Sequence, residues 1–150
     1  MDEATQRAAV VAEGMTWHRT PYHHHGRIKG AGVDCAMLLA EVFHACGLVE
    51  RVEPGHYPVQ WHLHRDEERF IGWLQQYAQP LPAGQALQPA DVALFRFGRT
   101  YSHGGLMVEP DLVLHAFNDR FTSGVILTRL DEAPLQGRDV LFWTFWKPHA

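Results

Sequence analysis

The sequence lacks the features that would place it in a membrane or on a polyanion. No apolar run approaches the roughly 20 residues that a membrane-spanning helix needs. The net charge is −4, and 20% of the residues are charged, so the composition makes no electrostatic case for binding nucleic acid or an acidic membrane surface. We therefore expect no nucleic acid and no membrane among the partners of this protein.

Cysteine is scarce, and the two cysteines present cannot pair with each other. Cys35 and Cys46 both fall within residues 34–47, which we predict to be helical. Their separation along such a helix is roughly 16 Å, whereas a disulfide needs Cα atoms within about 7 Å. We expect two free thiols, as is usual in a reducing compartment.

A secretory leader is also missing from the start of the sequence. Asp2 and Glu3 stand where a signal peptide would carry basic residues, and no apolar stretch follows them. We therefore expect cytoplasmic synthesis without a signal peptide. Action outside the cell would then need a carrier, lysis or a particle such as a virion.

What the sequence does contain is enough apolar material for a single domain over residues 1–150, since 46% of the residues are hydrophobic. Helical patterns occupy the first half, at residues 4–15, 34–47 and 66–77, with irregular segments at 16–32 and 54–64. Short strand-like runs occupy the second half, at residues 91–97, 104–108, 112–117, 125–130 and 140–146. This segregation predicts an α+β fold in which N-terminal helices pack on a C-terminal antiparallel sheet of about five strands.

Cys35 is the candidate nucleophile because it stands in the first turn of a predicted helix, directly after Asp34 as the N-cap. Unpaired backbone N–H groups and the helix dipole favour a thiolate at such a position. The same N–H groups can stabilise the oxyanion that forms when a thiolate attacks a carbonyl. Cys46 lies late in the helix beside Phe43 and Leu48, and we interpret it as a core residue.

A thiol nucleophile usually needs an imidazole base that a third group orients. Of the 11 histidines, His103 stands at the start of one predicted strand and His115 within the next. A three-residue loop at 109–111 would place the two histidines diagonally on one face of the hairpin. A two-residue loop would place them on opposite faces unless a bulge intervened, and the sequence leaves both arrangements open.

In their order along the chain, these residues resemble the NlpC family of papain-like cell-wall peptidases, in particular its phage-tail-associated members. The similar motifs are Thr-Pro-Tyr at 20–22, Val-Asp-Cys-Ala at 33–36, Pro-Ala-Asp at 89–91, Ser-His-Gly-Gly at 102–105 and Leu-His-Ala at 114–116. The segment from Tyr57 to His64 resembles a signature of the phage branch. The resemblance extends over residues 22–117, most of the chain.

The resemblance implies a papain-like fold in which Cys35 is the nucleophile, His103 the general base and His115 the residue that orients the base. It further implies a group of residues that bind the substrate or the oxyanion, or hold the helix start: Tyr22, Asp34 and Ser102.

The implied activity is hydrolysis of amide bonds in peptidoglycan stem peptides, through thiolate attack and hydrolysis of an acyl-enzyme, without a cofactor. The phage branch implies phage tail proteins as partners and a place in the virion tail.

Three departures from the family pattern leave the reacting groups intact but bear on substrate preference. Ala36-Met37 replaces Ser-Gly, Gly104 replaces Val, and Met107 replaces an aromatic residue.

A zinc hydrolase or another metal-binding protein is one alternative, because histidines are dense at residues 23–25 and 62–64. Zinc sites, however, favour histidines four residues apart on a helix or paired Cys-x-x-Cys motifs, and neither occurs here. We therefore predict no metal site and interpret His23, His24 and His25 as a solvated segment.

Two further alternatives keep the papain-like fold. One is a non-catalytic module for phage tail assembly or binding, and the other is an amidase or acyltransferase acting on a different acyl substrate. Trp143, Phe145 and Trp146 would suit a partner surface in the first case. Because residues 140–146 are apolar on both faces, we predict instead that these aromatic side chains belong to the core.

Overall fold

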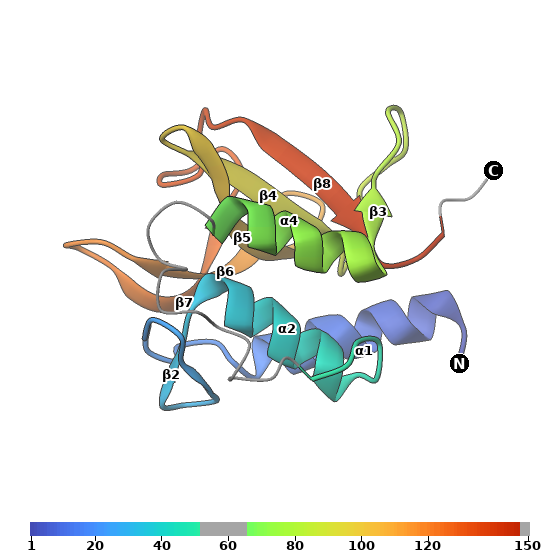
Figure 1. Ribbon diagram of the computed structural model, residues 1–150, viewed down its shortest axis with the longest axis horizontal. Helices are drawn as coiled ribbons and strands as arrows, with labels where there is room; N and C mark the ends of the chain where they lie inside the picture. The colour runs from blue at the N-terminus through green and yellow to red at the C-terminus, as the bar shows by residue number, and fades with distance from the viewer. Residues whose placement is uncertain (52–65, 148–150) are drawn as a thin grey trace.

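The computed structural model describes residues 1–51 and 66–147, with the backbone alone for residues 66–69. The helices are α1 (Glu3–Met15), α2 (Cys35–Ala45) and α4 (Asp66–Tyr77) (Figure 1). The strands are β1 (Arg27–Ile28), β2 (Gly32–Val33), β3 (Gln79–Pro80), β4 (Val92–Phe97), β5 (Thr100–Glu109), β6 (Leu112–Asn118), β7 (Ser123–Arg129) and β8 (Val140–Thr144). The predicted α+β architecture is confirmed. The loop predicted at 54–64, including the segment 57–64, lies outside the described residues.

The main sheet has six strands in the order β3-β8-β4-β5-β6-β7, and every neighbouring pair is antiparallel. Each of the five predicted strands is present, and β3 adds a short sixth strand at one edge. A separate pair, β1 and β2, interrupts the segment predicted to be irregular at 16–32. Two-residue strands carry no hydrophobic alternation, so their pairing follows from the surrounding fold rather than from a local pattern.

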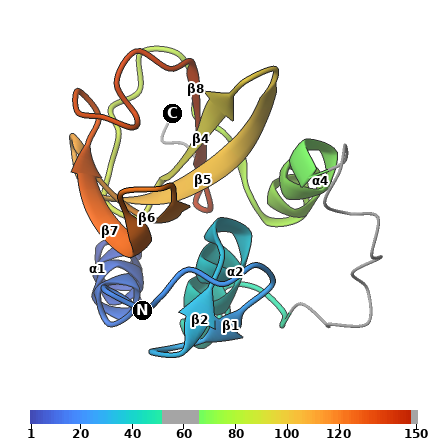
Figure 2. The ribbon, with the colours of Figure 1, turned by 90° about the vertical axis from the view of Figure 1, so that its left-hand side faces the viewer.

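Helices α1 and α2 lie side by side beneath the sheet, and α4 lies at its side near β5 (Figure 2). The larger core cluster fills the space between helices and sheet, with Leu38, Phe43, Leu106 and Leu114 fully buried. A smaller cluster on the opposite face includes Phe95 and other apolar residues: Ala93, Met107, Val113 and Leu135. Since both faces of the central strands are covered, their sequences are apolar without alternation.

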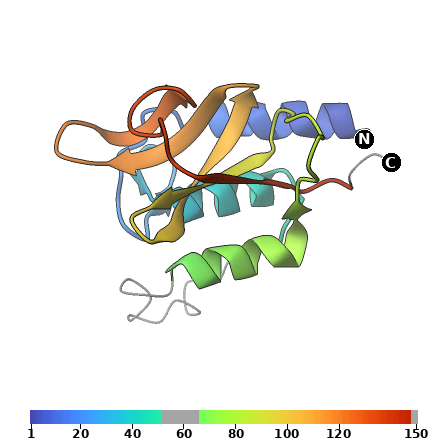
Figure 3. The ribbon, with the colours of Figure 1, turned by 90° about the horizontal axis from the view of Figure 1, so that it is seen from above.

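The hairpin that joins β6 and β7 projects at the end of the molecule away from the N-terminus (Figure 3). None of the helices in the described part of the chain has both the length and the apolar character needed to cross a bilayer.

The aromatic residues near the C-terminal strand are core, as predicted. Trp143 and Trp146 are buried, and the Phe145 ring stacks on Phe43 with centroids 3.9 Å apart.

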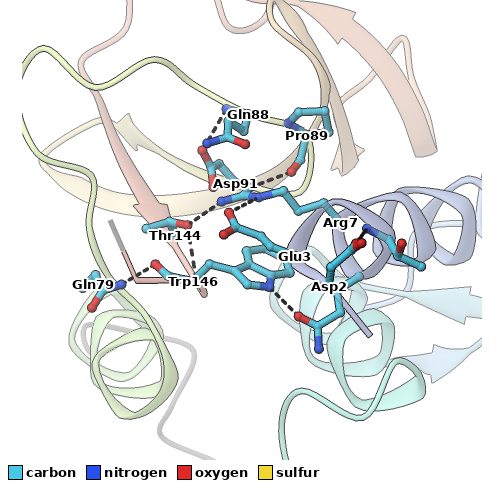
Figure 4. A network of polar contacts seen from close by, with 11 residues as sticks. Asp2, Glu3, Arg7, Gln79, Gln88, Pro89, Asp91, Thr144 and Trp146 are labelled. Atoms are coloured by element: carbon cyan, nitrogen blue, oxygen red, sulfur yellow. Dashed lines mark hydrogen bonds and ion pairs between the residues drawn. The ribbon is translucent and has the colours of Figure 1, made fainter. Parts of the chain in front are cut away.

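A buried guanidinium fastens α1 to the sheet (Figure 4). Arg7 Nη1 donates to Oδ1 of Asp91 and to the carbonyl of Pro89, both at 2.8 Å. Its Nη2 donates to Oγ1 of Thr144 at 3.2 Å. The other carboxylate oxygen of Asp91 accepts from the backbone N–H of Gln88 at 2.9 Å. The aspartate of the Pro-Ala-Asp motif is therefore a buried structural residue that depends on Arg7 for its counter-charge.

Helix α2 begins and ends at the residues that the sequence predicted. Oδ1 of Asp34 accepts from the Met37 N–H at 2.8 Å, which is the contact of an N-cap. Gly47 has φ +76°, and the Leu48 N–H returns to the Phe43 carbonyl, as at a glycine-terminated helix. Cys35 is consequently the first helical residue. Cys46 packs at the edge of the core, and neither cysteine forms a disulfide.

One hairpin beside β5 differs from the prediction, and the other takes one of the two arrangements that the sequence left open. His103 is not at the start of its strand, because a two-residue turn with Gly98 at φ +68° lets β5 pair with β4 from Thr100 onward. The turn between β5 and β6 has two residues, 110 and 111, rather than three. A bulge at Val108 supplies the additional residue, since Met107 pairs with Val113 and Glu109 with Leu112.

Candidate active site

The thiol of Cys35 lies against the strand that carries His103. Cys35 is half-buried at the N-terminus of α2, and its Sγ donates to the carbonyl oxygen of Ser102 across 3.9 Å. Ser102 directly precedes His103, so the first turn of α2 contacts β5 at the residue before the predicted base. A helix and a strand distant in sequence thereby bring the Cys35 thiol to the backbone next to His103, and the pairing of the two side chains stays a prediction.

Ser102 occupies a second bulge, and this explains why its carbonyl is available to the thiol. Phe95 pairs with His103 and Arg96 with Tyr101, which leaves Ser102 as the extra residue on β5. A bulged residue is not held in the ladder, and bulges commonly redirect groups beside active sites. The side chain of Ser102, predicted to bind substrate or the oxyanion, is half-buried here.

Three buried side chains form a hydrogen-bonded row across β5, β6 and β7. Nε2 of His103 lies 2.7 Å from Nδ1 of His115, and Nε2 of His115 lies 2.9 Å from Oγ1 of Thr128. All three residues are buried, and His115 is fully so. His115 is therefore in the position predicted for a residue that orients His103, and its own ring is held in turn by a hydroxyl.

Burial keeps both imidazoles neutral. Loss of solvation, together with smaller contributions from the neighbouring His115 and the positive charge of Arg138, lowers the pKa of His103 to about 3. Loss of solvation likewise lowers the pKa of His115 to about 4. At neutral pH the His103 ring is therefore unprotonated, which is the state a general base must start from.

An aromatic shell surrounds His103 and accounts for this loss of solvation. The ring centroid of Phe97 is 5.0 Å from that of His103, and the ring of Phe117 is 5.7 Å away, both edge-on. Phe95 lies 6.3 Å away on the preceding strand. The guanidinium of Arg138 stacks over Phe97 at 3.5 Å from the ring centroid, which brings its charge near the site.

The two remaining predicted site residues belong to the segments that lead into α2 and Cys35. Tyr22 forms an isolated bridge with Val33, two residues before the nucleophile, and is half-buried against the core. Asp34 is buried and caps α2. Its carboxylate also lies near the imidazoles of His24 and His25, the one group in the described part of the chain with the composition of a metal site.

Thr128 was not identified from the sequence. Its inward position on β7 follows the alternation of that strand, but many strands carry inward threonines. The hydrogen bond depends on the register that places His115 opposite Ile126 and Val113 opposite Thr128, which leaves Thr128 diagonal to His115. A local pattern contains no such information.

The fold is that of NlpC/P60 proteins of known structure. A protein of the NLP/P60 family from Staphylococcus aureus, described as similar to a lipoprotein, superposes with a TM-score of 0.66 at 16% identity, over 99% of this chain and 43% of that one. The protein NlpC2 from Trichomonas vaginalis superposes with a TM-score of 0.69 at 14% identity, over 99% of this chain and 49% of that one.

The NlpC/p60 domain of the peptidoglycan hydrolase SagA matches more of its own length, with a TM-score of 0.56 at 20% identity, over 90% of this chain and 96% of that domain. The chain thus spans less than half of the first two structures and nearly all of the third. No protein-family model and no curated protein matches the sequence.

Proposed function

We propose that this protein is a cysteine peptidase that hydrolyses amide bonds in peptidoglycan stem peptides. The observation that carries the proposal is the hydrogen bond between His103 and His115, beside a helix that begins with Cys35. The NlpC/P60-like fold supports it, since one of the similar structures is a domain of a peptidoglycan hydrolase. The low identities make the substrate part of the proposal rather than an observation.

The hydrogen-bonded row accommodates a set of tautomers suited to a general base. If Nδ1 of His103 accepts the thiol proton, the neutral ring carries its hydrogen on Nε2 and donates it to Nδ1 of His115. His115 then carries its hydrogen on Nε2 and donates it to Oγ1 of Thr128. Thr128 and His115 in this way leave the Nδ1 lone pair of His103 available for Cys35.

The proposed reaction proceeds in two steps. In the first, His103 takes the proton of Cys35 as the sulfur attacks the amide carbon, and the C–N bond breaks as His103 returns that proton to the leaving amine. In the second, His103 removes a proton from water, which attacks the thioester, and the thiol is regenerated with release of a carboxylate. Backbone N–H groups at the start of α2 stabilise the oxyanion in both steps.

The test of this proposal is the reactivity of Cys35 toward iodoacetamide as a function of pH, in Cys46→Ala protein with and without His103→Ala. We expect alkylation of Cys35 to remain fast below pH 7 and to slow when His103 is removed. Hydrolysis of purified muropeptides by the wild type, lost in Cys35→Ala and retained in Cys46→Ala, then identifies the substrate class. A Cys35 thiol that titrates near pH 8.5, like an unperturbed cysteine, and ignores His103 contradicts the proposal.

The same experiment separates the alternatives. A reactive Cys35 together with intact muropeptides favours an amidase or acyltransferase on another substrate. An unreactive Cys35 favours a non-catalytic module. We further propose association with a phage tail, supported by the resemblance of the segment 57–64, which lies outside the described residues, to a signature of the phage branch. Detection of the protein in purified virions by mass spectrometry tests this part.

A further inference from the structure

Three side chains that bind metals in other proteins converge immediately before α2. The imidazole nitrogens of His24 and His25 and a carboxylate oxygen of Asp34 all lie within 4.8 Å of one another. The two rings are stacked, with centroids 4.0 Å apart and planes inclined by 28°. Two imidazoles and one carboxylate form a ligand set typical of Zn²⁺ and related divalent transition metals.

The backbone holds this cluster, hereafter the His24–His25–Asp34 cluster, in place. The His25 N–H donates to Oδ2 of Asp34 at 2.7 Å, while Oδ1 of the same carboxylate caps α2. Each carboxylate oxygen has a second lone pair, so both remain able to bind an ion. His25 has φ +63°, a left-handed conformation that is unfavourable for a non-glycine residue and recurs at functional sites.

The segment around the cluster is also fastened at both ends. The His23 N–H donates to the Val33 carbonyl. The Gly26 N–H donates to the His23 carbonyl and closes a backbone turn in which His24 and His25 are the two central residues. The ligands therefore need little rearrangement to meet an ion, which reduces the ordering cost of binding.

We propose that the His24–His25–Asp34 cluster binds a divalent transition-metal ion, with Zn²⁺ as the ion best matched to its ligands. Three protein ligands leave one tetrahedral position for water or another small donor. The bound ion ties the segment that follows Tyr22 to the residue that precedes Cys35, and so stiffens one side of the candidate active site. This inference does not depend on the peptidase activity.

The sequence predicted no metal site, because three consecutive histidines in a loop have no defined geometry. The structure adds the ligand that the local pattern lacks. Asp34 stands nine residues after His25 and reaches it only through the pairing of β1 with β2. His23, in the same run, is not a member of the group, which provides a matched control.

The test is isothermal titration of the chelator-stripped full-length protein with ZnCl₂, with far-UV circular dichroism to verify that each variant folds. We expect one equivalent to bind to the wild type and to His23→Ala. His24→Ala/His25→Ala should weaken binding by roughly a hundredfold or more, because even outer-shell partners of a metal are worth about 10- to 100-fold. Asp34→Asn should also weaken binding, while its amide oxygen preserves the helix cap.

Substitution with Co²⁺ in Cys35→Ser protein identifies the ligands independently of any activity. We expect visible d–d bands of unchanged intensity and, in the wild type, no thiolate-to-cobalt charge-transfer band. Three results overturn the inference: no binding by the wild type, equal binding by the His24→Ala/His25→Ala protein, or loss of binding in Cys35→Ser. The last would assign the ion to the thiol, and the first two leave open whether Cys35 and His103 form a catalytic pair.

Discussion

Nε2 of His103 and Nδ1 of His115 lie 2.7 Å apart because a bulge at Val108 compensates for a short turn. With the two-residue turn at 110–111 and a regular ladder, the two rings would point to opposite faces of the sheet. The extra residue, Val108, returns both rings to the same face of the sheet. This pairing is the reason that a hairpin with an unremarkable sequence can support a base and its orienting group.

Removal of the Thr128 hydroxyl tests whether this row extends to a third residue. Thr128→Val preserves shape but leaves the buried Nε2 of His115 without its hydrogen-bond partner, which costs about 1–3 kcal/mol of stability. On the proposed function, we expect kcat to fall by about tenfold with little change in KM, because the preferred tautomer of His103 is no longer enforced. Steady-state kinetics on a muropeptide measure the change.

Thr128→Ser is the matched control, since it retains the hydroxyl and loses a methyl group. It should recover most of the kcat even if its stability is reduced. A Thr128→Val enzyme with unchanged kcat and pH profile would contradict the positioning role and leave Thr128 as a packing residue.

The lowered pKa values of His103 and His115 predict a loss of stability in acid. Below pH 6.5, the ordinary pKa of histidine, His103 and His115 bind protons in the unfolded chain but stay neutral in the folded chain. Stability is therefore full above pH 6.5 and falls as the pH drops toward 4, by up to about 1.4 kcal/mol per pH unit for each histidine. Urea denaturation at pH 7.5, 5.5 and 4.5 measures the slope.

Carboxylates also contribute to acid unfolding, so the difference between variants carries this test. His115→Gln removes one buried imidazole and should give a shallower slope than the wild type over this range. His18→Gln alters an exposed histidine and should leave the slope unchanged. Equal slopes in all three proteins would show that His115 is not protonated more readily on unfolding.

The ion pair between Arg7 and Asp91 should be one of the costliest to break. Asp91 is fully buried, so Asp91→Ala removes the buried counter-charge of the guanidinium and leaves it only the partly exposed Glu3, and we expect a loss of about 3–5 kcal/mol. Arg7→Ala should cost a similar amount, and the double variant much less than the two losses combined, because both remove one interaction. Guanidinium denaturation provides the free energies.

An exposed ion pair of similar geometry provides the comparison. Arg129 contacts Asp111 at 2.9 Å, with both side chains about half exposed, so Arg129→Ala should cost under about 1 kcal/mol. If the Arg7 and Arg129 variants lost equal stability, burial would not be the factor that makes the first pair matter.

Gly104 explains one departure from the family motif in structural terms. A Cβ built on Gly104 would overlap the ring of Phe70 from α4 and approach Cδ1 of Leu39 to 3.1 Å. Phe70 thus fills the space that a valine would need. We expect Gly104→Val to destabilise the fold by about 1–3 kcal/mol, as measured by thermal unfolding.

The partner of this clash can be removed to verify the cause. In a Phe70→Ala background the same Gly104→Val change should cost clearly less, because the valine enters the space vacated by the ring. An undiminished cost in the double variant would point to a backbone requirement for glycine instead of a contact with Phe70.

The sequence by itself determined the features that a few neighbouring residues encode. Asp34 and Gly47 mark the limits of α2 because a cap and a left-handed stop act within one turn of the helix. Cys35 is placed at a helix start by the same local rule. The five longer strands were equally readable, since each is an apolar run bounded by turn residues.

Tertiary structure alone decided how these elements meet. The bulges at Ser102 and Val108, the contact of Thr128 with His115, and the approach of Asp34 to His25 all depend on register between separate strands. Arg7 reaches Asp91 across 84 positions of sequence. Register is set by the packing of whole faces, and shifting a strand by one residue exchanges its faces, so no short pattern predicts it.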